Sequence, residues 1–148
     1  MEKKLDISVI SPVFNELENL ETFVESVTEV MNSTNMSWEL IIVDDGSDDG
    51  SSKILKKIGR QENIRSILLS KNYGQTTAIQ AGFDNAVGEY FVTLDSDLQN
   101  DPKDIPKLIK KLINEELDLV VGWRKDRKDN YFFRKRCTSV ENMKKFRA

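Results

Sequence analysis

The sequence contains no histidine and only one cysteine, Cys137. Without histidine the chain lacks the side chain that most often serves as a neutral-pH acid or base and as a metal ligand. One cysteine cannot form a disulfide within the chain, so a disulfide framework is excluded. Any catalysis or metal binding in this chain must therefore rest on carboxylates.

Long apolar runs are also missing. No run approaches the ~20 residues that a membrane-spanning helix needs. Residues 1–10 alternate apolar and polar side chains, unlike the hydrophobic segment of a secretory signal. The 148 residues are enough for one ordinary domain, since domains commonly have about 100 to 150 residues. The sequence therefore predicts a single cytoplasmic domain.

Positive charge is concentrated at the end of a chain whose net charge is −3. Residues 124–148 hold ten Lys or Arg against three Asp or Glu, together with Tyr131, Phe132 and Phe133. Such a segment suits the inner face of an anionic membrane, which would make the protein peripheral, but a solvated terminus fits the composition equally well. We predict no nucleic-acid partner.

Strand and helix patterns alternate along the chain. Short runs rich in Ile, Val and Leu predict strands at 5–11, 38–43, 64–69, 89–94 and 118–121. Helical spacing of apolar residues predicts helices from 17 to the polar stretch 32–35, at 51–59, from the turn 71–74 through 86, and at 102–113. This alternation indicates an α/β fold, with a mainly parallel sheet and helices on both faces.

Polar residues gather where three of these strands end, at 12–16, 44–49 and 95–99. In parallel α/β sheets, ligands bind beyond the carboxyl ends of the strands. We therefore expect the three clusters to converge on one crevice.

Asp95 and Asp97 stand on either side of Ser96, where the fourth strand opens into a loop. Carboxylate oxygens suit Mg²⁺ or Mn²⁺. In a regular strand the two side chains would point to opposite faces, so one cation could take both only if the chain bends there. Such a cation would bridge the phosphates of a nucleotide diphosphate and neutralise the charge of the leaving group. The alternative is a polar strand end in water, and Asp-x-Asp alone does not decide.

Asp44 and Asp45 follow the second strand. A carboxylate there could accept hydrogen bonds from a base or from ribose hydroxyls. Asp, Gly and Ser are also common turn formers, and for residues 48–52 a turn with a helix cap is the preferred interpretation. The position beside a predicted crevice favours a nucleoside role for Asp44 or Asp45, without choosing between them.

Four motifs in this order, SPVFNE at 11–16, VDDGS at 43–47, KNYGQ at 71–75 and LDSDLQ at 94–99, resemble inverting family-2 glycosyltransferases of the GT-A fold. DSDLQNDP at 95–102 and GWR at 122–124 further resemble the dolichol-phosphate mannosyltransferase and polyprenyl-phosphate glycosyltransferase branch. The resemblance covers about residues 7–136. It implies a Rossmann-like nucleotide-sugar-binding domain and inverting transfer from a UDP- or GDP-linked sugar.

The resemblance also implies roles for individual residues. Donor binding would fall to Pro12, Phe14, Glu16, Asp44 or Asp45, Lys71 and Arg124, and metal binding to Asp95, Asp97 and Gln99. Asp95 and Asp97 would be catalytic by stabilising the leaving group through the metal, and no general base is identifiable. A guanidinium such as that of Arg124 suits bidentate phosphate contact, whereas Lys71 is equally explained as a solvated loop lysine.

The expected acceptor is polyprenyl or dolichyl phosphate in cell-surface glycan synthesis. A lipid phosphate is already largely ionised and needs little base assistance. Residues 1–123 are predicted to form the donor domain, and 124–148 the start of an acceptor region that is truncated relative to the family. A sugar hydroxyl as acceptor in polysaccharide synthesis and a non-catalytic nucleotide-binding protein remain alternatives. A second copy or a membrane partner chain would supply the remaining acceptor side.

Other α/β classes fit the order of the motifs less well. In haloacid-dehalogenase phosphatases the Asp-x-Asp pair ends the first strand, and response-regulator receivers carry an acid pair after the first strand. Here the first predicted strand is followed by Asn15 and Glu16. The sequence also has neither a G-x-G-x-x-G nor a P-loop pattern, so these phosphate-binding loops are excluded.

Overall fold

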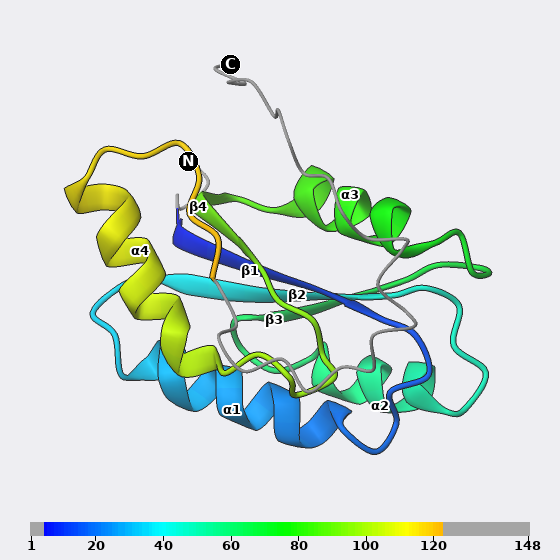
Figure 1. The fold of residues 1–148 in the computed structure, drawn as a ribbon. Helices are drawn as coiled ribbons and strands as arrows, with labels where there is room; N and C mark the ends of the chain where they lie inside the picture. The colour runs from blue at the N-terminus through cyan, green and yellow to red at the C-terminus, as the bar shows by residue number, and fades with distance from the viewer. Residues whose placement is uncertain (1–4, 123–148) are drawn as a thin grey trace, which may run out of the picture. The chain divides into compact units, whose positions relative to one another are not determined.

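The computed structural model describes residues 5–122 of the chain. The chain divides into two compact units, Met1–Lys107 and Leu108–Ala148. The first contains the whole sheet and the helices that flank it (Figure 1). The division predicted from the sequence, after residue 123, separates donor binding from an acceptor region. A division by compactness does not test that prediction.

Strands and helices alternate as predicted over most of the described chain. Their bounds are β1 Leu5–Val13, α1 Leu20–Asn32, β2 Trp38–Asp44, α2 Ser51–Ile58, β3 Ile64–Leu68, α3 Gln75–Asn85, β4 Gly88–Thr93, the 3-10 helix η1 Pro102–Asp104 and α4 Ile105–Asn114. The boundary between the two units falls within α4.

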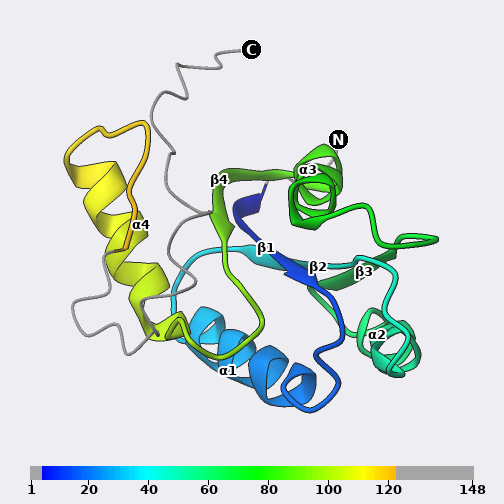
Figure 2. The same ribbon diagram turned by 45° about the vertical axis from the view of Figure 1, so that its right-hand side comes forward.

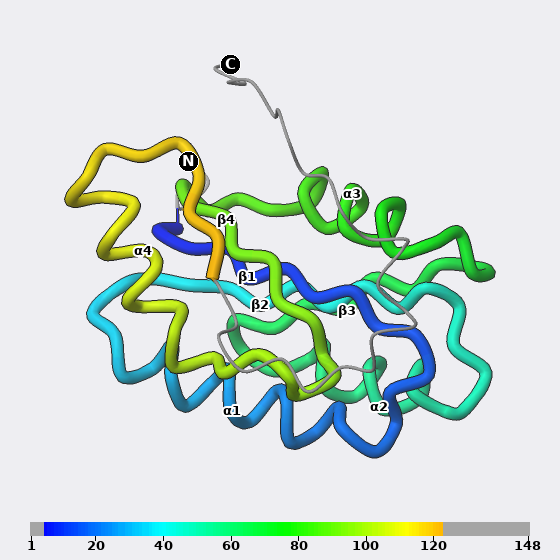
Figure 3. Tube along the Cα trace, in the orientation of Figure 1, coloured from blue at the N-terminus to red at the C-terminus, as the bar shows by residue number. Residues whose placement is uncertain are grey.

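The sheet has four strands in the order β3-β2-β1-β4, all of them parallel. Its register pairs Val9 of β1 with Leu40 of β2 on one side and with Val92 of β4 on the other. Figure 3 shows the β1 and β4 traces running beside each other. After β1 the chain adds β2 and β3 on one side of it and then β4 on the other. A topological switch point therefore lies between β1 and β4, and α/β sheets commonly bind ligands at such a point.

Helices cover both faces of this sheet, as the sequence predicts. Helix α3 lies on one face and helices α1 and α2 lie on the other (Figure 2). All seven residues of the central strand β2 are buried, whereas the edge strand β4 alternates half-buried and exposed residues. A parallel strand covered on both faces is mostly apolar, which explains the apolar run at residues 40–43 of β2. The two buried acids of this strand, Glu39 and Asp44, are hydrogen-bonded.

Two glycines allow close approaches that position the site. A side chain at Gly82 of α3 would collide with Ile10 of β1, so glycine lets α3 lie close against the sheet. Gly46 has a φ of +74°, and a Cβ there would collide with the backbone of Lys71 and Asn72. The loop after β2 and the loop before α3 therefore lie in direct contact.

A buried polar network ties together the amino ends of the four strands. Glu39 of β2 is 4% exposed, and its Oε1 accepts hydrogen bonds from Ser8 Oγ of β1 (2.6 Å) and from Val87 N (2.8 Å). Its Oε2 forms an ion pair with Arg65 Nη2 of β3 at 2.6 Å. Ser8 Oγ in turn accepts a hydrogen bond from Gly88 N of β4 (2.9 Å). Every strand thus contributes to one closed network.

The predicted fifth strand at 118–121 is wrong. Residues 118–122 form no strand, and Leu119 and Val121 are 61% and 77% exposed. A strand requires a neighbour that pairs with its backbone, and in the described part of the chain the sheet ends at β4. Apolar alternation alone could not supply that neighbour. Of the helices within residues 5–122, none has both the length and the apolar character needed to cross a bilayer.

Candidate active site

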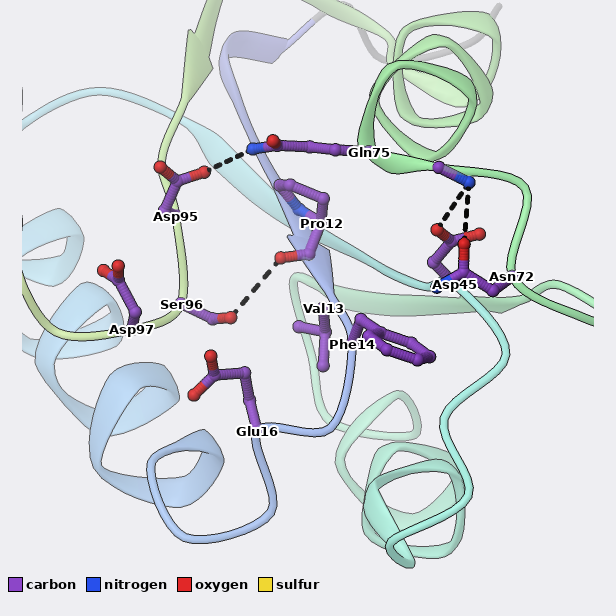
Figure 4. A pocket seen from close by; sticks show the side chains of 11 residues that line it. Pro12, Val13, Phe14, Glu16, Asp45, Asn72, Gln75, Asp95, Ser96 and Asp97 are labelled. Atoms are coloured by element: carbon purple, nitrogen blue, oxygen red, sulfur yellow. Dashed lines mark hydrogen bonds between the residues drawn. The ribbon is translucent and has the colours of Figure 1, made fainter. Parts of the chain in front are cut away.

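A pocket of about 380 Å³ opens at the carboxyl ends of β1, β2 and β4 and at the start of α3 (Figure 4). It is lined by Pro12, Val13, Phe14, Glu16, Asp45, Asn72, Gly74, Gln75, Asp95, Ser96 and Asp97. The expectation that the three polar clusters converge on one crevice is therefore confirmed.

The pocket is strongly acidic. Its wall carries four carboxylates, those of Glu16, Asp45, Asp95 and Asp97, and its lining residues within the described chain include no Lys or Arg. Four like charges around one small cavity repel one another and generate a potential that attracts cations. An anionic ligand would therefore need a cation to enter with it.

Asp95 and Asp97 reach the same cavity because the chain leaves strand geometry after β4. Leu98 has a φ of 59°, in the left-handed region, and Gln99 N donates a hydrogen bond to Asp97 Oδ1 at 3.0 Å. In Figure 4 Asp95 and Asp97 lie on the same side of the pocket, and the Ser96 side chain points from beside Asp97 toward Pro12. The chain bends at residues 96–98, and both acids line the pocket. That they share one cation stays a prediction.

The Asp45 carboxylate holds the loop that leads into α3. Its Oδ1 accepts a hydrogen bond from Tyr73 N at 2.7 Å, and its Oδ2 accepts one from Gly74 N at 2.8 Å. Asp45 is 3% exposed, yet it lines the pocket. Each oxygen retains a lone pair for a further donor, because one acceptor site on each is in use.

The Asp44 carboxylate is directed into its own loop. Its Oδ1 accepts hydrogen bonds from Ser47 N (3.1 Å) and Ser47 Oγ (2.5 Å), and its Oδ2 accepts one from Ser52 Oγ. Asp44 is 1% exposed and is not among the lining residues. Of the two adjacent acids, Asp45 is the one that faces the pocket.

The loop after β1, which carries Phe14 and Glu16, is tied to the loop after β2. Asn15 has a φ of 54°, its N donates to Ser47 Oγ at 2.9 Å, and its Oδ1 accepts from Asp48 N at 3.0 Å. These bonds extend the Asp44 network, because Ser47 belongs to both. The left-handed conformation suits asparagine better than most non-glycine residues.

Asp49 adds a second tie between the same loops. Its Oδ2 accepts a hydrogen bond from Leu17 N at 3.0 Å, and its Oδ1 accepts one from Ser51 N at 2.9 Å. Burial raises the pKa of Asp49, but the hydrogen bonds from Ser51 and Leu17 outweigh it and leave the pKa below its ordinary value. The carboxylate form therefore stabilises this junction.

Residues 8–148 match the sequence model of the family described as Glycosyl transferase family 2. The chain belongs to this family. The expected resemblance is thereby confirmed.

Curated relatives include enzymes named for polyprenyl phosphates. A dodecaprenyl-phosphate galacturonate synthase of Rhizobium johnstonii is 48% identical over 135 residues, covering 90% of this chain and 40% of that protein. An undecaprenyl-phosphate 4-deoxy-4-formamido-L-arabinose transferase of Salmonella choleraesuis is 40% identical over 139 residues, covering 93% of this chain and 42% of its own. The chain thus spans about two fifths of the length of these relatives.

Solved structures share the fold. The mannosyltransferase PcManGT from Pyrobaculum calidifontis, in complex with GDP-Man and Mn²⁺, superposes with a TM-score of 0.62 at 20% identity over 75% of this chain and 33% of that one. TarS 1–349 of S. aureus in complex with UDP gives a TM-score of 0.55 at 21% identity over 75% of this chain and 33% of its own. At these identities the likeness supports the predicted GT-A-like α/β fold.

Not every residue that the sequence singled out lines the pocket of this family 2 chain. Lys71 lies outside the lining, with its Nζ 5.2 Å from the centre of the Tyr73 ring, which is a cation–π distance. Gln99 is exposed and contacts Asp97 through its backbone. Arg124 lies outside the described residues. Their assigned roles stay predictions.

The structure adds lining residues that the sequence did not single out, among them Gln75, Asn72 and Ser96. Gln75 Nε2 donates a hydrogen bond to Asp95 Oδ1 at 2.9 Å, from the first residue of α3. The motif KNYGQ did draw attention to this segment, but only Lys71 was assigned. The sequence could have placed Gln75 at the pocket, because the loop after β3 also leaves the carboxyl edge of the sheet.

The donor set fits a divalent metal whose coordination is completed by a substrate. Among the residues that the structure describes, no group of three or more His, Cys, Asp or Glu side chains could hold a metal ion. Asp95 and Asp97 supply carboxylate oxygens to one pocket. Mg²⁺ is commonly bound in this way, by one or two carboxylates together with substrate phosphates and water.

Proposed function

We propose that this chain is the donor-binding part of an inverting glycosyltransferase that transfers a sugar from a UDP- or GDP-linked donor to polyprenyl phosphate. The observation that carries the proposal is the acidic pocket at the carboxyl edge of the sheet. Four carboxylates line it without a Lys or Arg among its described lining residues. A diphosphate, which is itself anionic, fits such a wall only together with Mg²⁺ or Mn²⁺.

Asp95 and Asp97 are the residues that would hold the metal, because they line the pocket with carboxylate oxygens. When bound, the metal supplies neutralising charge to the nucleoside diphosphate as it leaves the sugar. The neutral Gln75 amide leaves the negative charge of Asp95 intact for a cation. Gln99 remains a proposed further ligand.

The nucleoside would occupy the part of the pocket formed by Pro12, Phe14 and Asp45. Phe14 is 46% exposed, so its ring offers apolar surface for a base to cover. Asp45 retains acceptor sites for base or ribose donors after its two backbone bonds. Asp44 would act indirectly, by fixing the loop 44–52.

The acceptor proposal rests on two relatives, 48% and 40% identical to this chain, that are named for polyprenyl phosphates. A lipid phosphate is largely ionised at neutral pH, so its oxygen can attack with little base assistance. That property suits a chain without histidine. The basic residues 124–148 would bring the protein to an anionic membrane surface, where a second copy or a membrane chain is a further proposed partner.

The test is a calorimetric titration of UDP and of GDP into the full 148-residue chain, with and without Mn²⁺. Binding of one nucleotide only when Mn²⁺ is present supports the donor site and identifies the base. Binding of neither nucleotide at any Mn²⁺ concentration contradicts it. Sugar transfer to polyprenyl phosphate in vesicles, scored by the anomeric configuration of the product, then tests turnover and inversion.

A further inference from the structure

Helix α3 and the loop after β4 meet at the pocket through a side-chain hydrogen bond. Gln75, the first residue of α3, donates from Nε2 to Asp95 Oδ1, which follows β4, at 2.9 Å. Figure 4 shows the Gln75 side chain reaching across the pocket to the Asp95 carboxylate. The two residues are 20 positions apart in the chain, so the contact exists only because the fold places α3 beside the end of β4.

The base of Gln75 is itself held by another acid of the pocket. Asp45 accepts hydrogen bonds from Tyr73 N and Gly74 N, the two residues directly before Gln75. Gly74 has a φ of +97°, so this turn uses a conformation that most residues avoid. The position of Gln75 therefore depends on Asp45, at the other end of the pocket.

We propose that Gln75 is a positioning residue that orients Asp95 toward a divalent metal, and that Asp45 couples nucleoside binding to metal binding through Gln75. The inference rests on the function proposed above. Carboxylates that bind metals are commonly oriented by outer hydrogen bonds, and losing such a bond typically weakens metal binding about 10- to 100-fold. Neither Asp45 nor Gln75 needs to touch the metal for this effect.

The chemical type of the donor matters. An amide donates a hydrogen bond without carrying charge, so Asp95 keeps its full negative charge. Among the described residues, Asp95 Oδ2 receives no hydrogen bond from the protein, which leaves that oxygen available to a cation. An Arg or Lys at position 75 would instead compete with the cation for the same carboxylate.

The test compares Gln75→Met with a matched control, Gln80→Met. Methionine has nearly the length of glutamine but cannot donate a hydrogen bond. Gln80 lies on the same helix and makes the same kind of bond, from Nε2 to Asp84 Oδ1 at 2.8 Å, but it does not line the pocket. Both glutamines are exposed, so both variants should fold and melt at nearly the same temperature.

The readout is the Mn²⁺ concentration that gives half-maximal binding of the nucleotide that the wild type prefers. Gln75→Met should raise it about tenfold or more, while Gln80→Met leaves it unchanged. Affinity for the free nucleoside, which has no phosphate, should stay the same in both variants, as measured by NMR titration. A purely structural role for Gln75 would lower nucleoside affinity as well, and that result would overturn the assignment.

A double variant tests the coupling. Asp45→Asn weakens the hold on the loop before α3 and should itself raise the Mn²⁺ requirement. Because Asp45→Asn also weakens nucleoside binding directly, its effect on the Mn²⁺ requirement is first divided by its effect on free-nucleoside affinity. With Gln75→Met already present, the remaining effect of Asp45→Asn should be small, because the path to Asp95 is already broken. Fold-changes that simply multiply would overturn the coupling.

Two failures are distinguishable. A wild-type protein that binds no nucleotide with Mn²⁺ removes the proposed function, and this inference with it. Mn²⁺-dependent binding in the wild type, with an unchanged Mn²⁺ requirement in Gln75→Met, keeps the proposed function and overturns only the role of Gln75.

Discussion

The two ends of the sheet treat their carboxylates in opposite ways. At the amino end, Glu39 is buried and both of its oxygens are bonded, one of them to the cation of Arg65. At the carboxyl end, four acids surround a pocket whose described lining includes no cation. Glu39 joins strands together, whereas the four acids of the pocket have no cationic side chain among the described lining residues. A fold can maintain such charge at a binding site because the rest of the molecule supplies the stability.

The largest effect is expected from removing the acid at the amino end of the sheet. Glu39→Ala should lower the free energy of unfolding by about 3 kcal/mol, because it leaves Ser8, Val87 N and Arg65 without their shared acceptor. Arg65 is about half exposed, which lets water take up part of its charge. Chemical denaturation measures the loss.

The matched control for Glu39→Ala is Glu115→Ala. That residue forms an exposed pair with Lys111, and its removal should cost less than about 0.5 kcal/mol. Equal effects of the two substitutions would contradict the closed network at the amino end.

Removing an acid from the pocket at the carboxyl end should weaken binding strongly and change stability little. Asp97→Ala should weaken metal-dependent nucleotide binding about 100-fold, because losing only an outer contact of a metal ligand already costs 10- to 100-fold. The free energy of unfolding should stay within about 0.5 kcal/mol of the wild type, since relief of repulsion offsets the lost Gln99 contact. Calorimetry and denaturation on the same sample separate the two effects. The control is Asp104→Ala, which removes an exposed acid paired with Lys107. If Asp97→Ala lost as much stability as Glu39→Ala, the two ends of the sheet would not differ in the way described.

Asp44 is an intermediate case, because it lies at the carboxyl edge of the sheet but both of its oxygens are hydrogen-bonded, as in Glu39. Asp44→Ala should lower the free energy of unfolding by about 1 to 2 kcal/mol, through the unsatisfied Ser47 and Ser52 groups. Nucleotide affinity should fall less than in Asp97→Ala, since only the loop position changes. Asp48→Ala, an exposed acid in the same loop, serves as the reference. If Asp44→Ala lost nucleotide binding without any loss of stability, Asp44 would contact the nucleotide directly, which would contradict its assignment to the loop.

The smallest expected effect is the pH dependence of the Asp49 junction. Because the pKa of Asp49 is lowered in the folded state from 3.8, its contribution is complete above that value and is lost as the pH falls through the folded pKa. Asp49→Ala should therefore be less stable than the wild type at pH 7, by less than about 0.5 kcal/mol for so exposed a group. The two proteins should converge in acid thermal melts, once the pH has fallen below the folded pKa of Asp49. A difference that persists there would show that the charge of Asp49 is not what stabilises the junction.

Much of the fold followed from local patterns. Apolar runs with turns between them located β1 to β4, and helical spacing located α1 to α4. These patterns are local, because an element that is buried on one face or on both faces has apolar residues at a matching spacing in the sequence. The failure at 118–121 shows the limit of such patterns. Leu119 and Val121 have the side chains of a strand, but a strand also needs a paired neighbour, and no local pattern states whether one is present.

The sequence by itself determined that carboxylates follow three parallel strands, and therefore that they meet at one edge of the sheet. Only the tertiary structure decided which of them face the ligand. Asp44 and Asp45 are adjacent and chemically identical, yet one bonds to its own loop and the other to backbone 28 and 29 residues away. Gln75 gained its contact with Asp95 in the same way. Such choices depend on how loops distant in sequence pack together, and the fold alone brings those loops into contact.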